Sequence, residues 1–190
     1  GLGFTLYNNW QLYYWHHDLA IYYETDLSEG LFSRAGRAWY SNGQLKSIGN
    51  YTLGKREGLF KTWHKNGQLE STGNYKAEKG EGVFKKYHKN GQLYYEGYYI
   101  EGEKEGLFYK WYENGQLSDE KNYERGLWSG VWTRWHNNGQ LKSVGNYTAG
   151  KREGLFKTWH ENGQLESEGD YTLGKREGLF KTWHENGQLK

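Results

Sequence analysis

The chain contains no cysteine, no proline and no methionine among its 190 residues. Without cysteine there are no disulfide bonds and no thiolate metal sites. An average chain of this length carries roughly nine prolines, so their complete absence suggests that one proline-free unit is repeated. Hydrophobic residues make up only 35%, and no apolar run reaches the about 18 residues that indicate a membrane-spanning helix.

Aromatic residues, by contrast, account for 18% of the chain, although its mean hydropathy is −1.10. Disordered chains are poor in aromatics, so this composition predicts a folded protein whose burial depends on rings. Basic and acidic residues number 25 and 23, and they alternate in short clusters such as Lys55-Arg56-Glu57. A nucleic-acid partner would require a clustered basic surface, so none is expected.

The sequence repeats itself every 24 residues. Residues 15–38 match this repeat weakly, with Asp18-Leu19 in place of the usual Asn-Gly and an out-of-phase segment at 29–32. We therefore divide the chain into a degenerate N-terminal repeat or cap, residues 1–38, and a regular array, residues 39–190. The Asn-Gly pairs, which we expect at turns, are Asn42, Gly43, Asn66, Gly67, Asn90, Gly91, Asn114, Gly115, Asn138, Gly139, Asn162, Gly163, Asn186 and Gly187.

Asn-Gly between β-forming runs is a strong hairpin signal, and it predicts a type I′ turn with positive φ at Asn66 and Gly67. The resulting register pairs Phe60 with Gly73, which would place a ring over a glycine. Residues 52–57 are expected to form a polar loop between hairpins. The predicted fold is all-β: an elongated, single-layer antiparallel meander built from tandem 24-residue β-hairpin repeats.

One face of this sheet is predicted to be the structural core, and the other carries a column of large rings. The predicted core residues are Phe60, Phe84, Phe108, Trp132, Phe156 and Phe180, together with Tyr51, Tyr75, Tyr99, Tyr123, Tyr147 and Tyr171. The candidate binding stripe on the other face is Trp39, Trp63, Tyr87, Trp111, Trp135, Trp159 and Trp183. Such a stripe is typical of binding surfaces, although the same rings could instead pack against their neighbours.

The polar residues that recur at the repeat spacing do not predict a metal site or a catalytic site. Histidines recur from His64 to His184 at an expected spacing of about 9.6 Å, whereas the ligands of one zinc ion lie within roughly 4 Å of each other. Glutamates recur from Glu57 to Glu177, too far apart for a glycosidase pair, and are interpreted as solvated loop charges. No catalytic sequence motif is present, so we expect no enzyme, no metal and no cofactor.

The pattern Tyr-x-x-Gly-Lys-x-x-Gly, then aromatic positions and Asn-Gly-Gln-Leu, as in residues 51–69, resembles the MORN-repeat variant of bacterial proteins, including the YwqK-like antitoxin family. The resemblance implies a repeat sheet used for protein or membrane-surface contacts. Glu78 departs from the pattern, because most units carry glycine there, and this bears on the conformation of that loop.

Three functional hypotheses follow. The first is a non-enzymatic scaffold that presents its sheet to a protein partner or to a second copy of itself, since open edge strands can add end to end into a filament. The second, implied only by the resemblance, is an antitoxin or immunity protein that binds a cognate toxin. The third is an aromatic-stripe binder of carbohydrate or of a membrane surface. A bacterial cell-surface or extracellular location is favoured over the cytoplasm.

Overall fold

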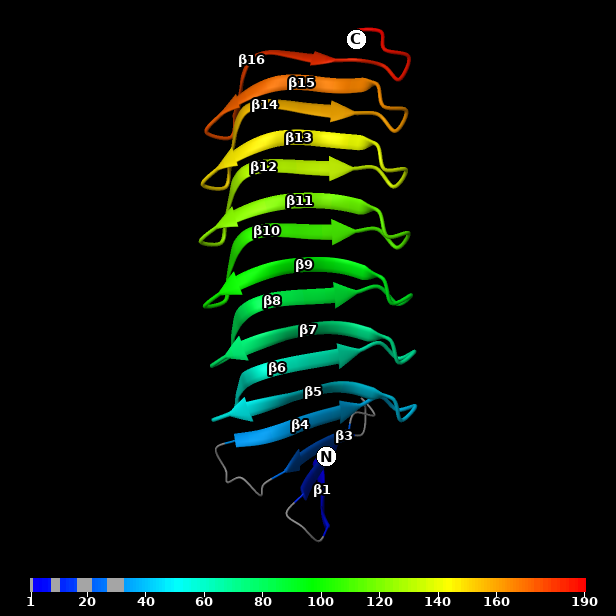
Figure 1. Ribbon diagram of the computed structural model, residues 1–190, viewed down its shortest axis with the longest axis vertical. Coiled ribbons are helices and arrows are strands. Elements are labelled where there is room, and N and C mark those ends of the chain that lie inside the picture. The colour runs from blue at the N-terminus through cyan, green and yellow to red at the C-terminus, as the bar shows by residue number, and fades with distance from the viewer. Residues whose placement is uncertain (1, 8–10, 17–21, 27–32) are drawn as a thin grey trace. The chain divides into compact units, whose positions relative to one another are not determined.

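The computed structural model describes residues 2–7, 11–16, 22–26 and 33–190, with side chains from Ala35 onward. Its regular elements are β-strands that follow one another in sequence order in one antiparallel meander (Figure 1). The strands are β1 (Leu2–Tyr7), β2 (Gln11–His16), β3 (Tyr22–Asp26), β4 (Ser33–Trp39), β5 (Leu45–Thr52), β6 (Lys55–Trp63), β7 (Leu69–Lys76), β8 (Lys79–Tyr87), β9 (Leu93–Ile100), β10 (Glu103–Trp111), β11 (Leu117–Glu124), β12 (Leu127–Trp135), β13 (Leu141–Thr148), β14 (Lys151–Trp159), β15 (Leu165–Thr172) and β16 (Lys175–Thr182). The predicted all-β antiparallel meander of hairpins is confirmed. No helix in the described part of the chain is long and apolar enough to cross a membrane.

The chain divides into two compact units. Unit 1 comprises Gly1–Gln92 with Tyr99–Gly102, and unit 2 comprises Leu93–Tyr98 with Glu103–Lys190. In unit 1 the first strands already pair as antiparallel neighbours, β1 with β2, β2 with β3 and β3 with β4. The sequence features noted at Asp18-Leu19 and at residues 29–32 lie outside the described residues.

The predicted register holds along most of each hairpin and changes near its tip. In the hairpin β6–β7, Phe60 lies opposite Gly73 as expected, but Trp63 lies opposite Leu69 after a bulge. The His64 amide donates to the Gln68 carbonyl at 2.8 Å, so three residues form the loop. Directly paired residues share a face of the sheet. Leu69 therefore lies on the Trp63 face, and not on the Phe60 face to which the register predicted from a two-residue turn assigns it.

The predicted type I′ turn at Asn66-Gly67 is also wrong. Gly67 has a φ of 85°, but Asn66 does not have a positive φ, and the Gly67 amide donates to the His64 carbonyl at 2.9 Å. This is the three-residue hairpin loop in which a type I turn is followed by a left-handed glycine. The Asn-Gly pairs do lie at the turns, but backbone conformation does not explain why asparagine occupies the first position.

Type I′ turns occur instead at the opposite ends of the strands. Leu53 and Gly54 have φ values of 51° and 75°, and they connect the directly paired residues Thr52 and Lys55. The polar loop expected over residues 52–57 is therefore a two-residue turn whose flanking residues belong to β5 and β6. Glu78 keeps the same conformation with a φ of 76°, although a side chain there is strained relative to glycine.

The core consists of rings that lie over glycines, but the partners differ from the prediction. A Cβ added to Gly73 would lie 2.3 Å from the Phe84 ring, and one added to Gly49 would lie 2.4 Å from the Phe60 ring. Each ring thus covers the glycine of the preceding strand and not that of its own hairpin partner. Gly58 has open space around a Cβ, so its φ of 73° explains this glycine column.

The core rings contact one another edge to face along each unit. In unit 1, Phe60 lies 5.2 Å from Tyr51 and 5.4 Å from Tyr75, measured between ring centroids. In unit 2, Phe156 lies 5.5 Å from Tyr147 and 5.1 Å from Tyr171. Aromatic rings prefer this geometry because a positive ring edge meets a negative face. The rings therefore provide the burial that the sparse aliphatic content does not.

Candidate functional site

The tip asparagines connect each repeat to the next. The Asn138 side chain accepts the Gln140 amide at 3.0 Å and donates to the Glu161 carbonyl at 2.8 Å. Asn66 makes the equivalent bonds to Gln68 and Lys89. Asparagine suits this position because its amide offers both an acceptor and a donor. The recurrence of Asn-Gly thus reflects two needs, a bridging amide followed by a left-handed glycine.

The histidine column forms a second set of bonds between repeats. His136 Nε2 lies 2.8 Å from the Trp159 carbonyl, and His160 Nε2 lies 3.0 Å from the Trp183 carbonyl. A carbonyl can only accept, so Nε2 carries the proton. Tyr112 replaces histidine in the same column and donates its hydroxyl to the Trp135 carbonyl at 2.8 Å. Among the described residues no group of three or more acidic or histidine side chains could hold a metal ion.

The recurring glutamates connect the turns at the other side of the sheet. Glu57 accepts the Ala77 amide at 2.8 Å, and Glu105 accepts the Arg125 amide at 2.8 Å. Glu81 and Glu153 make the same bond, so the interpretation as solvated loop charges is wrong for these four carboxylates, each of which binds the first left-handed residue of the next turn. Glu177 accepts from the Thr172 hydroxyl instead. The signal in the sequence was the exact repeat spacing of the glutamates, which solvated charges do not require.

Arg56 and Glu78 form a linkage of a different kind at one turn. Glu78 Oε1 accepts from Arg56 Nε at 2.6 Å, and its Oε2 accepts from the Arg56 amide at 2.7 Å. The hydrogen bond from the Arg56 side chain, assisted by that from its amide, lowers the pKa of the Glu78 carboxyl. Arg56 also lies 3.8 Å from the centroid of the Tyr75 ring. The departure from glycine at position 78 therefore supplies an ion pair in place of backbone freedom.

The tryptophan stripe lies on the face opposite the core rings. Side chains alternate between faces along a strand, and the ring contact between Tyr109 and Trp111 at 5.8 Å agrees with their sharing one face. All seven stripe residues are half-buried. The six tryptophans each stand opposite a leucine, as Trp159 does with Leu165. Part of each indole is packed on its own hairpin, and part faces solvent.

A second apolar column runs beside the stripe, and the sequence analysis did not single it out. Leu155 is 47% exposed and Val131 is 56% exposed, although both belong to strands whose next residue points into the core. The large apolar residues at this repeat position are Leu59 and Val83 in unit 1, and Leu107, Val131, Leu155 and Leu179 in unit 2. Between the two columns lie charged pairs, such as Lys157 with Glu168 at 3.5 Å. We call this surface the tryptophan face.

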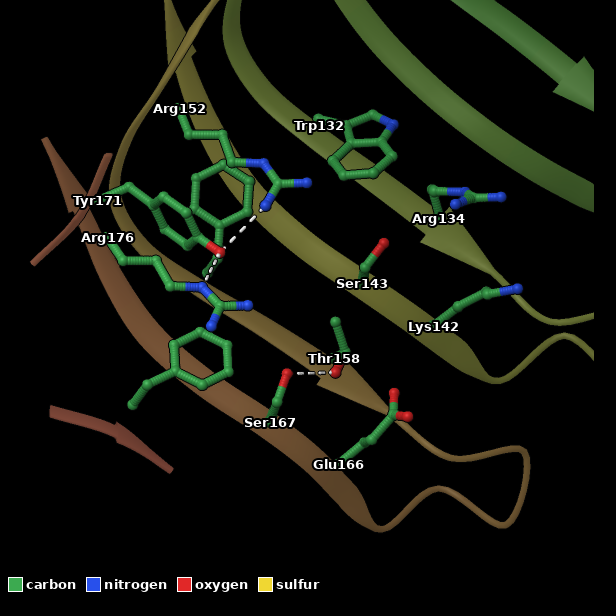
Figure 2. Close-up of a pocket in the computed structure, with 12 residues that line it drawn as sticks. Trp132, Arg134, Lys142, Ser143, Arg152, Thr158, Glu166, Ser167, Tyr171 and Arg176 are labelled. Atoms are coloured by element: carbon green, nitrogen blue, oxygen red, sulfur yellow. Dashed lines mark hydrogen bonds between the residues drawn. The ribbon is translucent and has the colours of Figure 1, made fainter. Parts of the chain in front are cut away.

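On the opposite, aromatic face, unit 2 has a cavity of about 320 Å³. It is lined by side chains of β12 to β16, with Trp132 and Arg134 on one side and Arg152, Tyr171 and Arg176 on the other (Figure 2). The Tyr171 hydroxyl accepts from Arg152 Nη1 at 3.1 Å and from Arg176 Nε at 3.4 Å. Burial raises the pKa of Tyr171. The hydrogen bonds from Arg176 and Arg152 and their positive charges lower it by more, so the pKa of Tyr171 is below its ordinary value.

The repeat that precedes this cavity departs from the others. Lys121 occupies the position of the core glycines and stands opposite Trp132. A ring cannot lie over a residue that has a Cβ there, and Trp132 packs against Trp128 at 6.0 Å and Tyr147 at 5.8 Å. The Lys121 ammonium lies 4.8 Å from the Trp128 ring. The sequence contained this signal, because phenylalanine and glycine are replaced in the same repeat.

Hairpins joined to their neighbours by the same side-chain bonds every 24 residues define a β-hairpin repeat protein. The family model described as MORN repeat variant matches residues 36–52, 56–77, 80–101, 104–125, 128–149, 152–172 and 176–190. These segments make up more than half of the chain, which therefore belongs to the MORN repeat variant family. A search among curated proteins finds no match.

Proposed function

We propose that this MORN-repeat sheet is a non-enzymatic scaffold whose tryptophan face binds a protein partner. The observation that supports the proposal is the exposed aliphatic column of unit 2. Its members range from 47% exposure at Leu107 to 85% at Leu179, and it runs beside half-buried tryptophans of the same strands. Aligned apolar residues that remain exposed mark interaction surfaces, whereas scattered ones do not.

The chemistry of the tryptophan face favours a protein over the other candidate partners. Lys157 and Lys181 both pair with Glu168, at 3.5 and 3.6 Å, so the apolar columns are separated by charges of both signs. Non-obligate protein interfaces combine apolar areas with a polar rim, and paired charges beside an apolar column fit that composition. An anionic membrane surface would select a single sign of charge, and sugar binding would use more open ring faces than half-buried indoles provide.

The partner can be a different protein, such as a toxin, or a second copy of the chain. A toxin corresponds to the antitoxin hypothesis, which rests on the YwqK-like resemblance alone. A second copy corresponds to self-assembly. Both alternatives use the same surface in this proposal, so one pair of variants tests the surface and a measurement of oligomeric state separates the alternatives.

The test places a charge on the face and compares it with a charge elsewhere. Leu155→Glu and Leu107→Glu interrupt the column. The control Leu173→Glu makes the same substitution at a leucine that is 68% exposed and lies at a turn, outside the column. Glu101 already occupies the equivalent turn position, so this control is compatible with the backbone. We expect a protein captured from the source organism's extract by the wild type and the control to be lost with the face variants.

The same proteins are examined by light scattering over a range of concentrations. Oligomers that dissociate only in the face variants identify a second copy as the partner. Equal capture by all variants, or equal loss in the control, would show that the tryptophan face is not the binding surface. Far-ultraviolet circular dichroism confirms that each variant keeps its sheet. Turnover of a substrate that is retained in these variants would contradict the proposal that the protein is not an enzyme.

A further inference from the structure

We propose that the cavity on the aromatic face of unit 2 binds a small organic acid through its phosphate or carboxylate group. The cavity lies on the face opposite the surface proposed for protein binding, so the two proposals stand independently. All of its lining residues belong to strands β12 to β16 of one unit. Its volume of about 320 Å³ lies at the lower end of the about 300–1,000 Å³ that small-molecule sites occupy.

The cavity has an excess of positive charge. Its cationic lining residues are Arg134, Lys142, Arg152 and Arg176, and its one acidic lining residue is Glu166. Arg134 is partly neutralised, because its Nε lies 3.4 Å from an Asp119 carboxylate oxygen. Within the described part of the chain, Lys142, Arg152 and Arg176 have no carboxylate partner. Arg56 differs in this respect, because Glu78 neutralises it in the equivalent position of unit 1.

Three residues that line the cavity also carry buried donors that have no hydrogen-bond partner. The Oγ of Ser143 and the Nε1 of Trp132 are such atoms, and Ser143 is only 5% exposed. Arg134 Nε belongs to the same group, because its 3.4 Å ion contact with Asp119 does not have hydrogen-bond geometry. Buried polar groups are nearly always paired. Three residues that line one cavity therefore carry a donor whose hydrogen bond the chain itself does not supply.

The repeat explains why Ser143 lacks a partner. In the hairpins β6–β7 and β14–β15 the equivalent serine bonds a threonine across the pair, as Ser167 does with Thr158 at 2.6 Å (Figure 2). Ser143 stands opposite Arg134 instead, and no hydroxyl reaches it. The exchange of threonine for arginine therefore adds a cation and frees a hydroxyl at the same place, which is the combination that an oxyanion requires.

Tyr171 provides a further donor on the other side of the cavity. Its oxygen accepts from both Arg152 and Arg176, so its own hydrogen remains available for a bound anion. Arg152 lies 5.1 Å from the Phe156 ring centroid, and Arg176 lies 4.1 Å from that of Phe180. This stacking holds both guanidinium groups in place before a ligand binds, and guanidinium planes match the oxygens of phosphate and carboxylate.

The test uses phenyl phosphate and benzoate as separate probes, with phenol as the neutral control. Isothermal titration calorimetry measures affinity, and the indole N–H signals in a nitrogen-15 NMR spectrum report contact with Trp132. Trp132→Phe identifies the Trp132 signal and introduces the residue that most repeats carry there. We expect at least one acid to bind saturably with a dissociation constant below about 10 mM and to shift that signal. We expect phenol to bind more weakly.

Arg152→Gln is expected to weaken binding about tenfold, since it removes a charge-assisted hydrogen bond. Ser143→Ala should weaken binding severalfold without lowering the urea midpoint, because its hydroxyl has no hydrogen bond within the chain to lose. The matched control is Lys104→Gln, which removes the same charge from the equivalent position of another repeat, where the ammonium lies 4.7 Å from the Tyr123 ring. We expect the control to bind normally.

Several outcomes would overturn the proposal. They are the absence of saturable binding of both acids below about 10 mM, equal affinity for phenol, and equal weakening by Lys104→Gln and Arg152→Gln. The last result would mean that the general positive charge of the chain, and not the cavity, attracts the anion. Binding of phenyl phosphate without benzoate, or the reverse, supports the proposal and identifies which oxyanion the cavity selects.

Discussion

Replacing Gly145 by alanine tests whether the core is built from rings lying over glycines. The added Cβ would lie 2.1 Å from Cε1 and 2.2 Å from Cδ1 of Phe156. Carbon atoms in contact normally stand about 3.5–4.0 Å apart, so the ring must move by more than an ångström. Phe156 is buried with 8% exposure and has little space into which to move.

The expected loss of stability is about 3 kcal/mol. Forcing extra atoms into a packed core costs about 1–3 kcal/mol. The shift also disturbs the edge-to-face contacts of Phe156 with Tyr147 at 5.5 Å and with Tyr171 at 5.1 Å, each of which contributes about 0.5–1.5 kcal/mol. Alanine restricts the unfolded chain more than glycine does and so offsets about 0.4–1 kcal/mol of this loss.

Urea unfolding followed by circular dichroism measures the change, with Gly154→Ala as the matched control. No atom lies within 4 Å of a Cβ at Gly154, but its φ is 73°, so alanine there costs about 1–2 kcal/mol through backbone strain alone. Both substitutions are repeated in a Phe156→Leu background. Removing the ring should relieve most of the cost of Gly145→Ala and none of the cost of Gly154→Ala.

The coupling between the two sites decides the question. If Gly145→Ala costs the same with leucine at position 156 as with phenylalanine, the ring is not the cause of the destabilisation, and the explanation of this glycine column is wrong. Equal relief of both glycine variants would point to a general loosening of the sheet.

Three further predictions concern the bonds between repeats, each measured by urea unfolding. Asn138→Ala removes the hydrogen bonds to the Gln140 amide and to the Glu161 carbonyl and should destabilise the chain by about 1–2 kcal/mol. An unchanged midpoint would show that water replaces these exposed bonds. Glu78→Gln should cost less than about 1 kcal/mol at pH 7, because the pair with Arg56 is well exposed. Since the folded pKa of Glu78 is lowered, this difference should disappear as the pH falls through that pKa, below the ordinary value of 4.5, and a difference that persists in acid would refute the ion-pair explanation. Ser129 stands where the other repeats carry the glutamate that binds a turn amide, and it lies next to Glu124. The double change Ser129→Glu with Glu124→Thr restores that glutamate, removes the neighbouring acid and should stabilise the chain by about 1 kcal/mol. No gain would mean that the turn-binding carboxylates contribute nothing to stability.

The repeat period predicted the hairpins and their central register correctly, as at Phe60 and Gly73. The type I′ turn was assigned to the wrong end of the strands, because Asn-Gly satisfies both a type I′ turn and the loop that occurs. What distinguishes them is the bond from the asparagine amide to a carbonyl 23 residues later, as from Asn138 to Glu161. A partner in the next repeat is invisible to reasoning about a single turn.

The candidate sites show the same division. The tryptophan column could be read from the sequence, but its half-burial and the exposure of Leu155 beside it could not. The cavity depends on Arg134, Ser143 and Arg152 meeting from separate strands. Each of these residues looks like an ordinary variation of the repeat when it is considered alone.

By itself the sequence determined the class of fold, the spacing of its hairpins and the two faces along the central part of each hairpin, because alternation and a 24-residue period are local properties of the chain. Only the tertiary structure decided which glycine each ring covers and which donors are left unpaired at Ser143 and Trp132. These features depend on contacts between neighbouring repeats, where the small differences among repeats bring different side chains together.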